Sequence, residues 1–260
     1  LASETRRLAR EALQGKWGKA ALVGLIYALL TGLISGILNL IPIAGPIAQA
    51  IIQIPLTFGF VATLIKLKRG ENVTYTEFFS NGFSNFASSW KVTLWTAVKL
   101  IVPAILIFVS VFIIVLGVGV DNYTALSSST SSGYLAGSTV AASTTPNIQN
   151  PVLCVIGFIL LVVSSIWSTV KSYLYKPTFF ILFDNPNMSA KDIVEESEKI
   201  MTGNRWKYFC LELSFIGWYI LVGFTLGIGM LWLLPYMLIA QVVFYEFLAG
   251  KEKKVEAREI

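Results

Sequence analysis

Residues 201–218 read MTGNRWKYFCLELSFIGW, and this stretch changes character half-way along. Polar and charged residues are frequent up to Lys207, whereas an almost purely apolar run begins at Tyr208. The same order, a tryptophan, then a lysine within two positions, then a long apolar run, recurs at Trp17-Gly18-Lys19 and at Trp90-Lys91. The recurrence indicates that three long apolar segments begin at the same kind of boundary.

The composition argues against a soluble globular protein. The chain has 260 residues, of which 55% are hydrophobic and only 13% are charged. A soluble domain has about 25% charged residues, so most of this apolar surface is expected to face lipid. The chain has no histidine, the commonest general base and metal ligand, and no nucleophile constellation. We therefore expect no catalytic residues, no metal site and no cofactor.

Six apolar runs have about the 20 residues that a helix needs to cross the hydrocarbon core. They cover about 20–40, 43–65, 100–120, 152–170, 208–226 and 230–248. Short turns at 42–46 and 227–229 join the first pair and the last pair. The sequence thus predicts one all-α integral membrane domain over 1–260, a polytopic protein whose six transmembrane helices form three hairpins. The segment 121–151, rich in Ser and Thr, is expected to be a flexible extracytoplasmic loop.

The basic residues predict the orientation in the membrane. All 20 lysines and arginines lie in or at the edges of the N-terminal arm, the second and fourth connections and the C-terminal tail. The other three connections contain none. The positive-inside rule therefore places both termini in the cytoplasm. Acidic residues are interleaved with the basic ones, so anionic headgroups account for this charge better than nucleic acid does.

Each predicted hairpin follows a segment with the apolar spacing of an amphipathic helix. These segments are 3–19, 75–90 and 189–206, and in the second the apolar positions are Phe79, Phe83, Phe86 and Trp90. We expect them to lie at the cytoplasmic interface, with 189–206 as the favoured contact surface for a partner. The predicted interface anchors are Trp17, Lys19, Trp90, Lys91, Trp206 and Lys207.

A few polar residues within the spans form the candidate site. Ionisable residues in a membrane are costly and are candidates for function, and amides there must find partners. The candidates are Glu212, Glu246, Lys99, Gln241, Gln49 and Gln53. The two glutamates either pair with Lys99, Lys207 or Arg205 or form a substrate or ion site. The glutamines either join neighbouring helices by hydrogen bonds or line a polar path.

The last third of the chain resembles a known family. Within residues 179–245, FILFDNPNMSAKDIVEESEKIMTGNRWKYFCLELSFIGW is followed by TLGIGMLWLLPY and FYEFL. The features that carry the resemblance include Asp184, Ser189, Trp218, Thr225, Gly227, Gly229, Trp232, Pro235, Tyr236 and Tyr245, and near the N-terminus Ala9-Arg10, Leu13 and Gly15-Lys16-Trp17. They are similar to an uncharacterised integral membrane family, found mainly in Gram-positive bacteria and known only as domain of unknown function nine hundred and seventy-five. The resemblance implies a six-helix fold in the bacterial plasma membrane, with no established reaction, substrate or site residues.

Two classes of function are most consistent with these patterns, ahead of a membrane-embedded hydrolase or transferase. The first is a non-enzymatic plasma-membrane protein that binds lipid or another membrane protein as an assembly or regulatory factor. The second is a transporter or channel for a small molecule or ion, with the polar residues lining its path. The expected partners are membrane lipids, another membrane protein or a second copy of the chain. Gly32 with Gly36 and Gly223 with Gly227 have the spacing of close helix packing.

Overall fold

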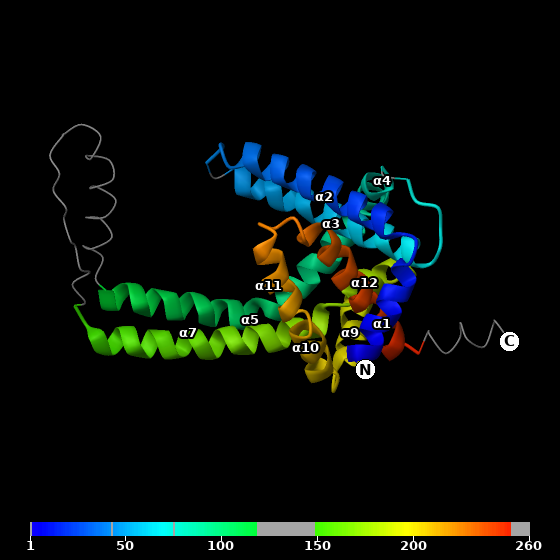
Figure 1. Cartoon of the computed structure of the whole chain (residues 1–260). Helices are drawn as coiled ribbons and strands as arrows, with labels where there is room; N and C mark the ends of the chain where they lie inside the picture. The colour runs from blue at the N-terminus through cyan, green and yellow to red at the C-terminus, as the bar shows by residue number, and fades with distance from the viewer. Residues whose placement is uncertain (1, 43, 75, 119–148, 251–260) are drawn as a thin grey trace. The chain divides into compact units, whose positions relative to one another are not determined.

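The computed structural model describes residues 2–42, 44–74, 76–118 and 149–250, and within these ranges all regular structure is helical, with no strand. The elements are α1 Ala2–Leu13, α2 Trp17–Leu38, α3 Ala44–Lys68, α4 Glu77–Ser84, α5 Phe86–Val118, α7 Pro151–Ser172, the 3-10 turn η1 Tyr173–Tyr175, α8 Thr178–Asp184, α9 Ala190–Met201, α10 Arg205–Leu213, α11 Ile216–Phe224 and α12 Met230–Leu248 (Figure 1). The predicted loop over 121–151 lies almost entirely outside the described residues.

Six helical stretches of the described residues are long and apolar enough to cross a membrane. They are Trp17–Leu38, Ala44–Lys68, Phe86–Val118, Pro151–Asp184, Arg205–Phe224 and Met230–Leu248. The prediction of an all-α chain with six such helices is therefore confirmed, and the chain is a multi-pass membrane protein. The third stretch begins well before the predicted 100–120, because the end of the amphipathic segment and the apolar run form one continuous helix, α5.

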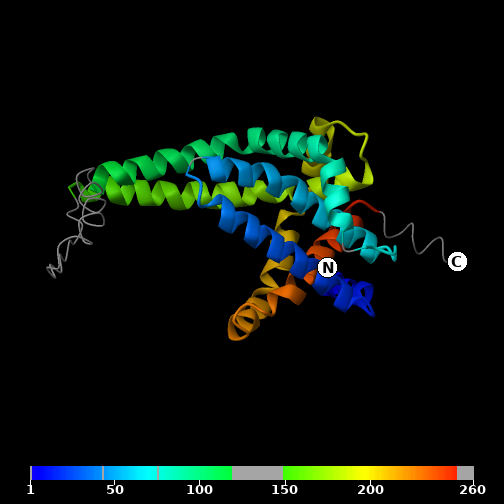
Figure 2. The same ribbon diagram turned by 90° about the horizontal axis from the view of Figure 1, so that it is seen from above.

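The chain divides into two compact units, one of residues 1–97 and 173–260 and the other of residues 98–172. In the second unit, α7 runs beside the C-terminal part of α5, as both views show (Figures 1 and 2). Glycines allow the two backbones to approach closely. A Cβ atom on Gly157 would lie 2.7 Å from Ile114 Cγ1, and one on Gly117 would lie 2.7 Å from Cys154 Sγ.

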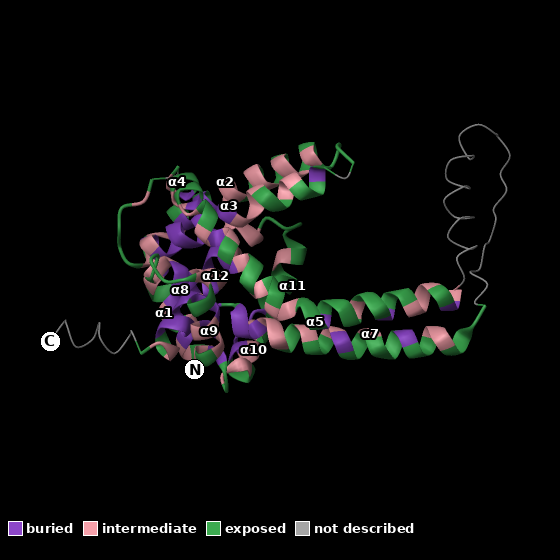
Figure 3. Cartoon of the chain, turned by 180° about the vertical axis from the view of Figure 1, so that it is seen from behind, coloured by how far each residue is buried: buried purple, intermediate pink, exposed green. Residues whose placement is uncertain are grey.

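The core of the first unit surrounds the C-terminal parts of α3 and α12 (Figure 3). Of the 18 residues that form the most apolar stretch of each helix, 61% are buried in α3 and 56% in α12, but only 11% in α2. Shorter helices bury their apolar faces against this centre: α1 packs on α12, and α4 and α8 pack on α3. The fully buried side chains that fill it include Leu13, Leu56, Phe58, Leu64, Phe78, Ile181, Ile193, Tyr208 and Phe244.

Two glycines allow α4 to lie directly across α3. A Cβ atom on Gly59 would meet the carbonyl oxygen of Phe78, and one on Gly82 would meet the carbonyl oxygen of Pro55. Neither backbone oxygen can move away without bending its helix. Any larger residue at either position would therefore separate the two helices.

Pro55, inside α3, determines how the start of α5 is held. Proline has no N–H, so it leaves the carbonyl oxygen of Ile51, one turn earlier, without its helical donor. The indole Nε1 of Trp90 donates to this oxygen at 3.2 Å. The interaction fixes the first turns of α5 to the middle of α3.

The fifth apolar run is interrupted, which the sequence did not predict. α10 ends at Leu213 and α11 begins at Ile216. At the break, the backbone N–H of Phe215 donates to the carbonyl oxygen of Glu212 at 3.0 Å, which tightens the turn to a 3-10 geometry. The carbonyl oxygen of Ser214 accepts a hydrogen bond from the Arg6 guanidinium at 3.3 Å. The N-terminal helix thus contacts the C-terminal end of α10.

Candidate functional site

The two glutamines of α3 make hydrogen bonds to α2. Gln53 Nε2 donates to Tyr27 Oη at 3.0 Å, and Tyr27 Oη lies 3.1 Å from Thr57 Oγ1. One turn earlier, Gln49 Nε2 donates to Ser35 Oγ at 2.8 Å. Amides within apolar surroundings need such partners, and these bonds join the two helices. Gln241 is half-buried on α12.

Glu246 belongs to an ion-pair cluster formed by the C-terminal ends of α3, α8 and α12. It pairs with Lys68, and its Oε1 lies 3.5 Å from the Arg69 guanidinium. Arg69 also lies 2.7 Å from Asp184 Oδ1, and Tyr245 Oη donates to Asp184 Oδ2 at 3.2 Å. The carboxylates of Asp184 and Glu246 are only 8% and 11% exposed. Their burial is offset because two cations balance the two anions.

Glu212 lies in different surroundings. Its Oε1 is 3.4 Å from Lys176 Nζ, and its side chain is 28% exposed. Lys207 Nζ donates to Asn204 Oδ1 at 2.9 Å. The cations that the structure shows beside the two glutamates, Lys68, Arg69 and Lys176, are not those that the sequence suggested. Glu246 and Lys68 are 178 residues apart, so no local spacing reveals their pairing.

Lys99 belongs to the second compact unit and is half-buried in α5. Of the candidate site residues in the first unit, Glu246, Glu212 and the two glutamines of α3 each have partners of their own. None of the hydrogen bonds or ion pairs described above joins Glu212 to Glu246 or either glutamate to the glutamines.

The predicted anchor residues have varied surroundings. The ring of Trp17 packs on that of Tyr236 at 5.9 Å between centroids, and Trp90 holds the Ile51 carbonyl oxygen. Trp206 is 71% exposed and its ring lies 5.1 Å from that of Phe209. Lys19, Lys91 and Lys207 are exposed.

The apolar face of α9, the favoured contact surface from the sequence, is covered by the chain itself. Ile193 and Val194 are fully buried, and α9 packs on η1 and α8. Ser197 Oγ donates to the Leu174 carbonyl oxygen at 2.5 Å, and Tyr175 Oη donates to Glu198 Oε1 at 2.6 Å. Only the charged face of α9 remains for a partner.

An apolar pocket of about 290 Å³ lies between the end of α1, the start of α2, and α11 and α12. We call it the tryptophan pocket, and it is lined by Arg10, Trp17, Trp218, Leu221, Val222, Thr225, Gly229, Trp232, Leu233 and Tyr236. The Tyr236 ring is central, because its centroid is 5.9 Å from that of Trp17 and 6.1 Å from that of Trp218. No spacing in the sequence predicted this pocket, although most of its lining belongs to the motifs that carry the family resemblance.

The three arginines of α1 differ in their charge environment. Arg7 lies 2.5 Å from Glu4 and 2.9 Å from Glu11. Its hydrogen bond holds the pKa of Glu4 below the ordinary value of 4.5. Arg10 lines the tryptophan pocket, and the Arg6 guanidinium donates to the Ser214 carbonyl oxygen. Within the described ranges, neither Arg6 nor Arg10 has a carboxylate at ion-pair distance.

Comparison with known proteins identifies the family. The chain matches the family described as "Protein of unknown function (DUF975)" over residues 2–252. The chain belongs to this family. The resemblance seen in the sequence is thereby confirmed for both ends of the chain. No match was found among curated proteins or among solved structures.

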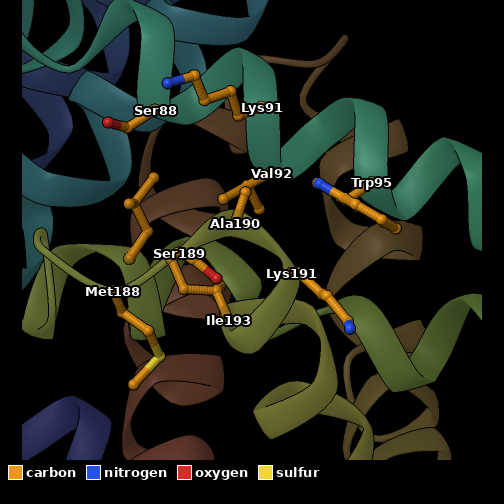
Figure 4. A pocket seen from close by; sticks show the side chains of 10 residues that line it. Ser88, Lys91, Val92, Trp95, Met188, Ser189, Ala190, Lys191 and Ile193 are labelled. Carbon is orange, nitrogen blue, oxygen red and sulfur yellow. The ribbon is translucent and has the colours of Figure 1, made fainter.

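This family member has a second hollow, of about 280 Å³, between the start of α5 and the loop from α8 to α9 (Figure 4). Its lining includes Ser88, Lys91, Trp95, Ser189 and Lys191. Figure 4 shows that the ammonium groups of the two lysines point away from one another. Ser189 Oγ is occupied as the N-cap of α9, since it accepts from the Asp192 N–H at 3.2 Å. The hollow therefore offers no convergent cation pair. Among the described residues, no three His, Cys, Asp or Glu side chains gather as a metal site.

Proposed function

We propose that this protein is a non-enzymatic lipid-binding protein of the bacterial plasma membrane that acts as an assembly or regulatory factor. In this proposal both termini lie in the cytoplasm, and the tryptophan pocket holds a hydrocarbon chain of the bound lipid. The pocket is the observation that carries the proposal. Its walls are aromatic and aliphatic, and its volume of about 290 Å³ is near the lower limit of small-molecule sites.

Aromatic walls suit this role for a physical reason. Tryptophan and tyrosine offer large apolar surfaces with a polar edge, and they favour the boundary between hydrocarbon and headgroups. Trp218 and Trp232 come from α11 and α12, whereas Trp17 begins α2, so three helices contribute to one apolar wall. A chain bound there would bring these helices together.

The polar residues within the helices support a structural role better than a transport path. Gln49 and Gln53 are bonded to α2, and Glu246 lies in a charge-balanced cluster. The amphipathic helix α9 is covered on its apolar face, so the tryptophan pocket replaces it as the contact surface in this proposal.

Native mass spectrometry of the protein released from mild detergent tests the proposal. We expect wild-type protein to retain one lipid, and Val222→Trp to lose it because the new ring fills the pocket. Val163→Trp is the matched control, since Val163 is 58% exposed on α7 in the second unit and does not line the pocket. Wild-type protein without lipid, or equal retention by Val222→Trp and wild type, would refute the proposal.

A further inference from the structure

We propose, on the basis of the lipid-binding function above, that the tryptophan pocket selects an anionic phospholipid. Arg10, with the charge of Arg6 beside it, holds the phosphate-bearing headgroup, and the aromatic wall holds an acyl chain. The inference rests on the charge around the pocket, which the lipid-binding proposal does not use.

The charge on α1 is compensated on one side of the helix and uncompensated on the other. Glu4 and Glu11 both pair with Arg7, so that guanidinium has two carboxylates within 3 Å. Arg6 and Arg10 are four residues apart and therefore share a face of α1. Neither has an ion-pair partner in the described part of the chain, and no acidic residue lines the pocket. Arg10 thus brings an uncompensated positive charge to the pocket, and Arg6 carries a second one on the same face of α1.

Both arginines lie next to residues of the pocket. Arg10 is part of the lining, together with Tyr236 at the centre of the aromatic wall. Tyr236 Oη also donates to the backbone carbonyl oxygen of Arg6 at 3.4 Å. The hydroxyl end of Tyr236 therefore marks the polar side of the pocket, next to α1.

The remaining lining is apolar. Leu221, Val222 and Leu233 contribute aliphatic surface, and Thr225 Oγ1 is occupied by a hydrogen bond to the Val222 carbonyl oxygen at 2.9 Å. A ligand that matches the whole pocket has an anionic end and a hydrocarbon end. Guanidinium groups bind phosphate oxygens through charge-assisted hydrogen bonds, often two at once. A free phosphate ion would leave the apolar wall empty, and a zwitterionic lipid would add its own cation beside the two arginines.

The choice of anionic over zwitterionic lipid is measured by competition. The full-length protein is placed in nanodiscs with equal amounts of phosphatidylglycerol and phosphatidylcholine that carry the same acyl chains. Native mass spectrometry then gives the ratio of the two lipids retained. We expect wild type to favour phosphatidylglycerol by roughly tenfold, and Arg10→Gln to bring the ratio close to one. Arg7→Gln is the matched control on the same helix, and its ratio should equal that of wild type.

The outcomes separate this inference from the proposed function. If wild type retains lipid but shows no preference for phosphatidylglycerol, the selection is refuted and lipid binding stands. If Arg10→Gln keeps the wild-type preference, or if Arg7→Gln loses it to the same extent, Arg10 does not hold the headgroup. If no lipid is retained at all, both proposals fail. Unfolding temperatures of the two variants, measured in the same nanodiscs, show that each is folded before its ratio is compared.

Discussion

Replacement of Trp90 by phenylalanine should destabilise the protein through one backbone carbonyl group. The indole N–H of Trp90 supplies the hydrogen bond that Pro55 denies to the Ile51 carbonyl oxygen. Phenylalanine keeps most of the ring surface but removes the donor. The side chain of Ile51 faces outward from an apolar stretch of α3, so little water is available to replace the bond. An unsatisfied carbonyl in such surroundings costs about 1–3 kcal/mol.

A double-mutant cycle isolates this contribution. In Pro55→Ala protein, residue 55 regains an N–H, which can donate to the Ile51 carbonyl oxygen within α3. Trp90→Phe should therefore cost about 1–3 kcal/mol with Pro55 present and close to nothing in the Pro55→Ala background. The cost of losing the proline ring contacts cancels in the cycle.

Thermal unfolding in mild detergent, followed by circular dichroism, gives the comparison. By the scaling for domains of 150–250 residues, the single variant should melt about 2–12 °C lower than wild type. Trp95→Phe is the control, because Trp95 is 41% exposed. The reasoning is refuted if Trp90→Phe has the same effect in both backgrounds, or if it is no worse than Trp95→Phe.

Three further substitutions test other contacts by the same unfolding measurement. Glu246→Gln should cost about 2–4 kcal/mol because it removes a buried carboxylate that balances the charges of Lys68 and Arg69. Glu212→Gln should cost less than about 1 kcal/mol because the ion pair of Glu212 with Lys176 is more exposed, and equal effects would contradict this difference in burial. Gly157→Leu should lower the free energy of unfolding by about 1–3 kcal/mol or more, because the new side chain would collide with α5. Gly32→Leu is the control, because the space around Gly32 is open and the stability should change little. A larger effect of Gly32→Leu than of Gly157→Leu would contradict the described packing. Ser197→Ala should cost about 1–2 kcal/mol because the buried Leu174 carbonyl oxygen loses its donor, and an unchanged melting temperature would show that this bond contributes nothing.

The sequence was informative about features that depend on local pattern. Length and apolarity predicted six helices able to cross a membrane, because each such helix satisfies its own backbone hydrogen bonds and needs no distant partner to be recognised. Motifs near both ends of the chain predicted the family. The predicted boundaries were least accurate for the third helix, since an amphipathic and an apolar segment can continue as one helix without any break in spacing.

Features that depend on contacts between distant segments could not be predicted. The partners of Glu246 lie far away in the sequence, and the tryptophan pocket joins α1 and α2 to α11 and α12. The spacing of glycine pairs likewise did not predict where helices pack closely. Among the described residues, the expected close packing at Gly32, Gly36, Gly223 and Gly227 is wrong, because a Cβ atom built at any of them would have no atom of a neighbouring element within 4 Å. Close approach occurs at Gly59, Gly82, Gly117 and Gly157, which have no such spacing.

The packing of α1 on α12 has a consequence for how the protein is made. Tyr236 donates to the backbone of Arg6, 230 residues earlier, so α1 makes this contact only after α12 has been synthesised. At about 5–20 residues per second, translation takes roughly 10–50 s to produce this partner. During that time Ala9 and Leu13, which are fully buried in the finished protein, lack their final contacts. An amphipathic helix can bury such residues in the membrane interface. The amphipathic pattern of α1 therefore allows the helix to lie on the membrane surface until α12 is inserted and packs against it.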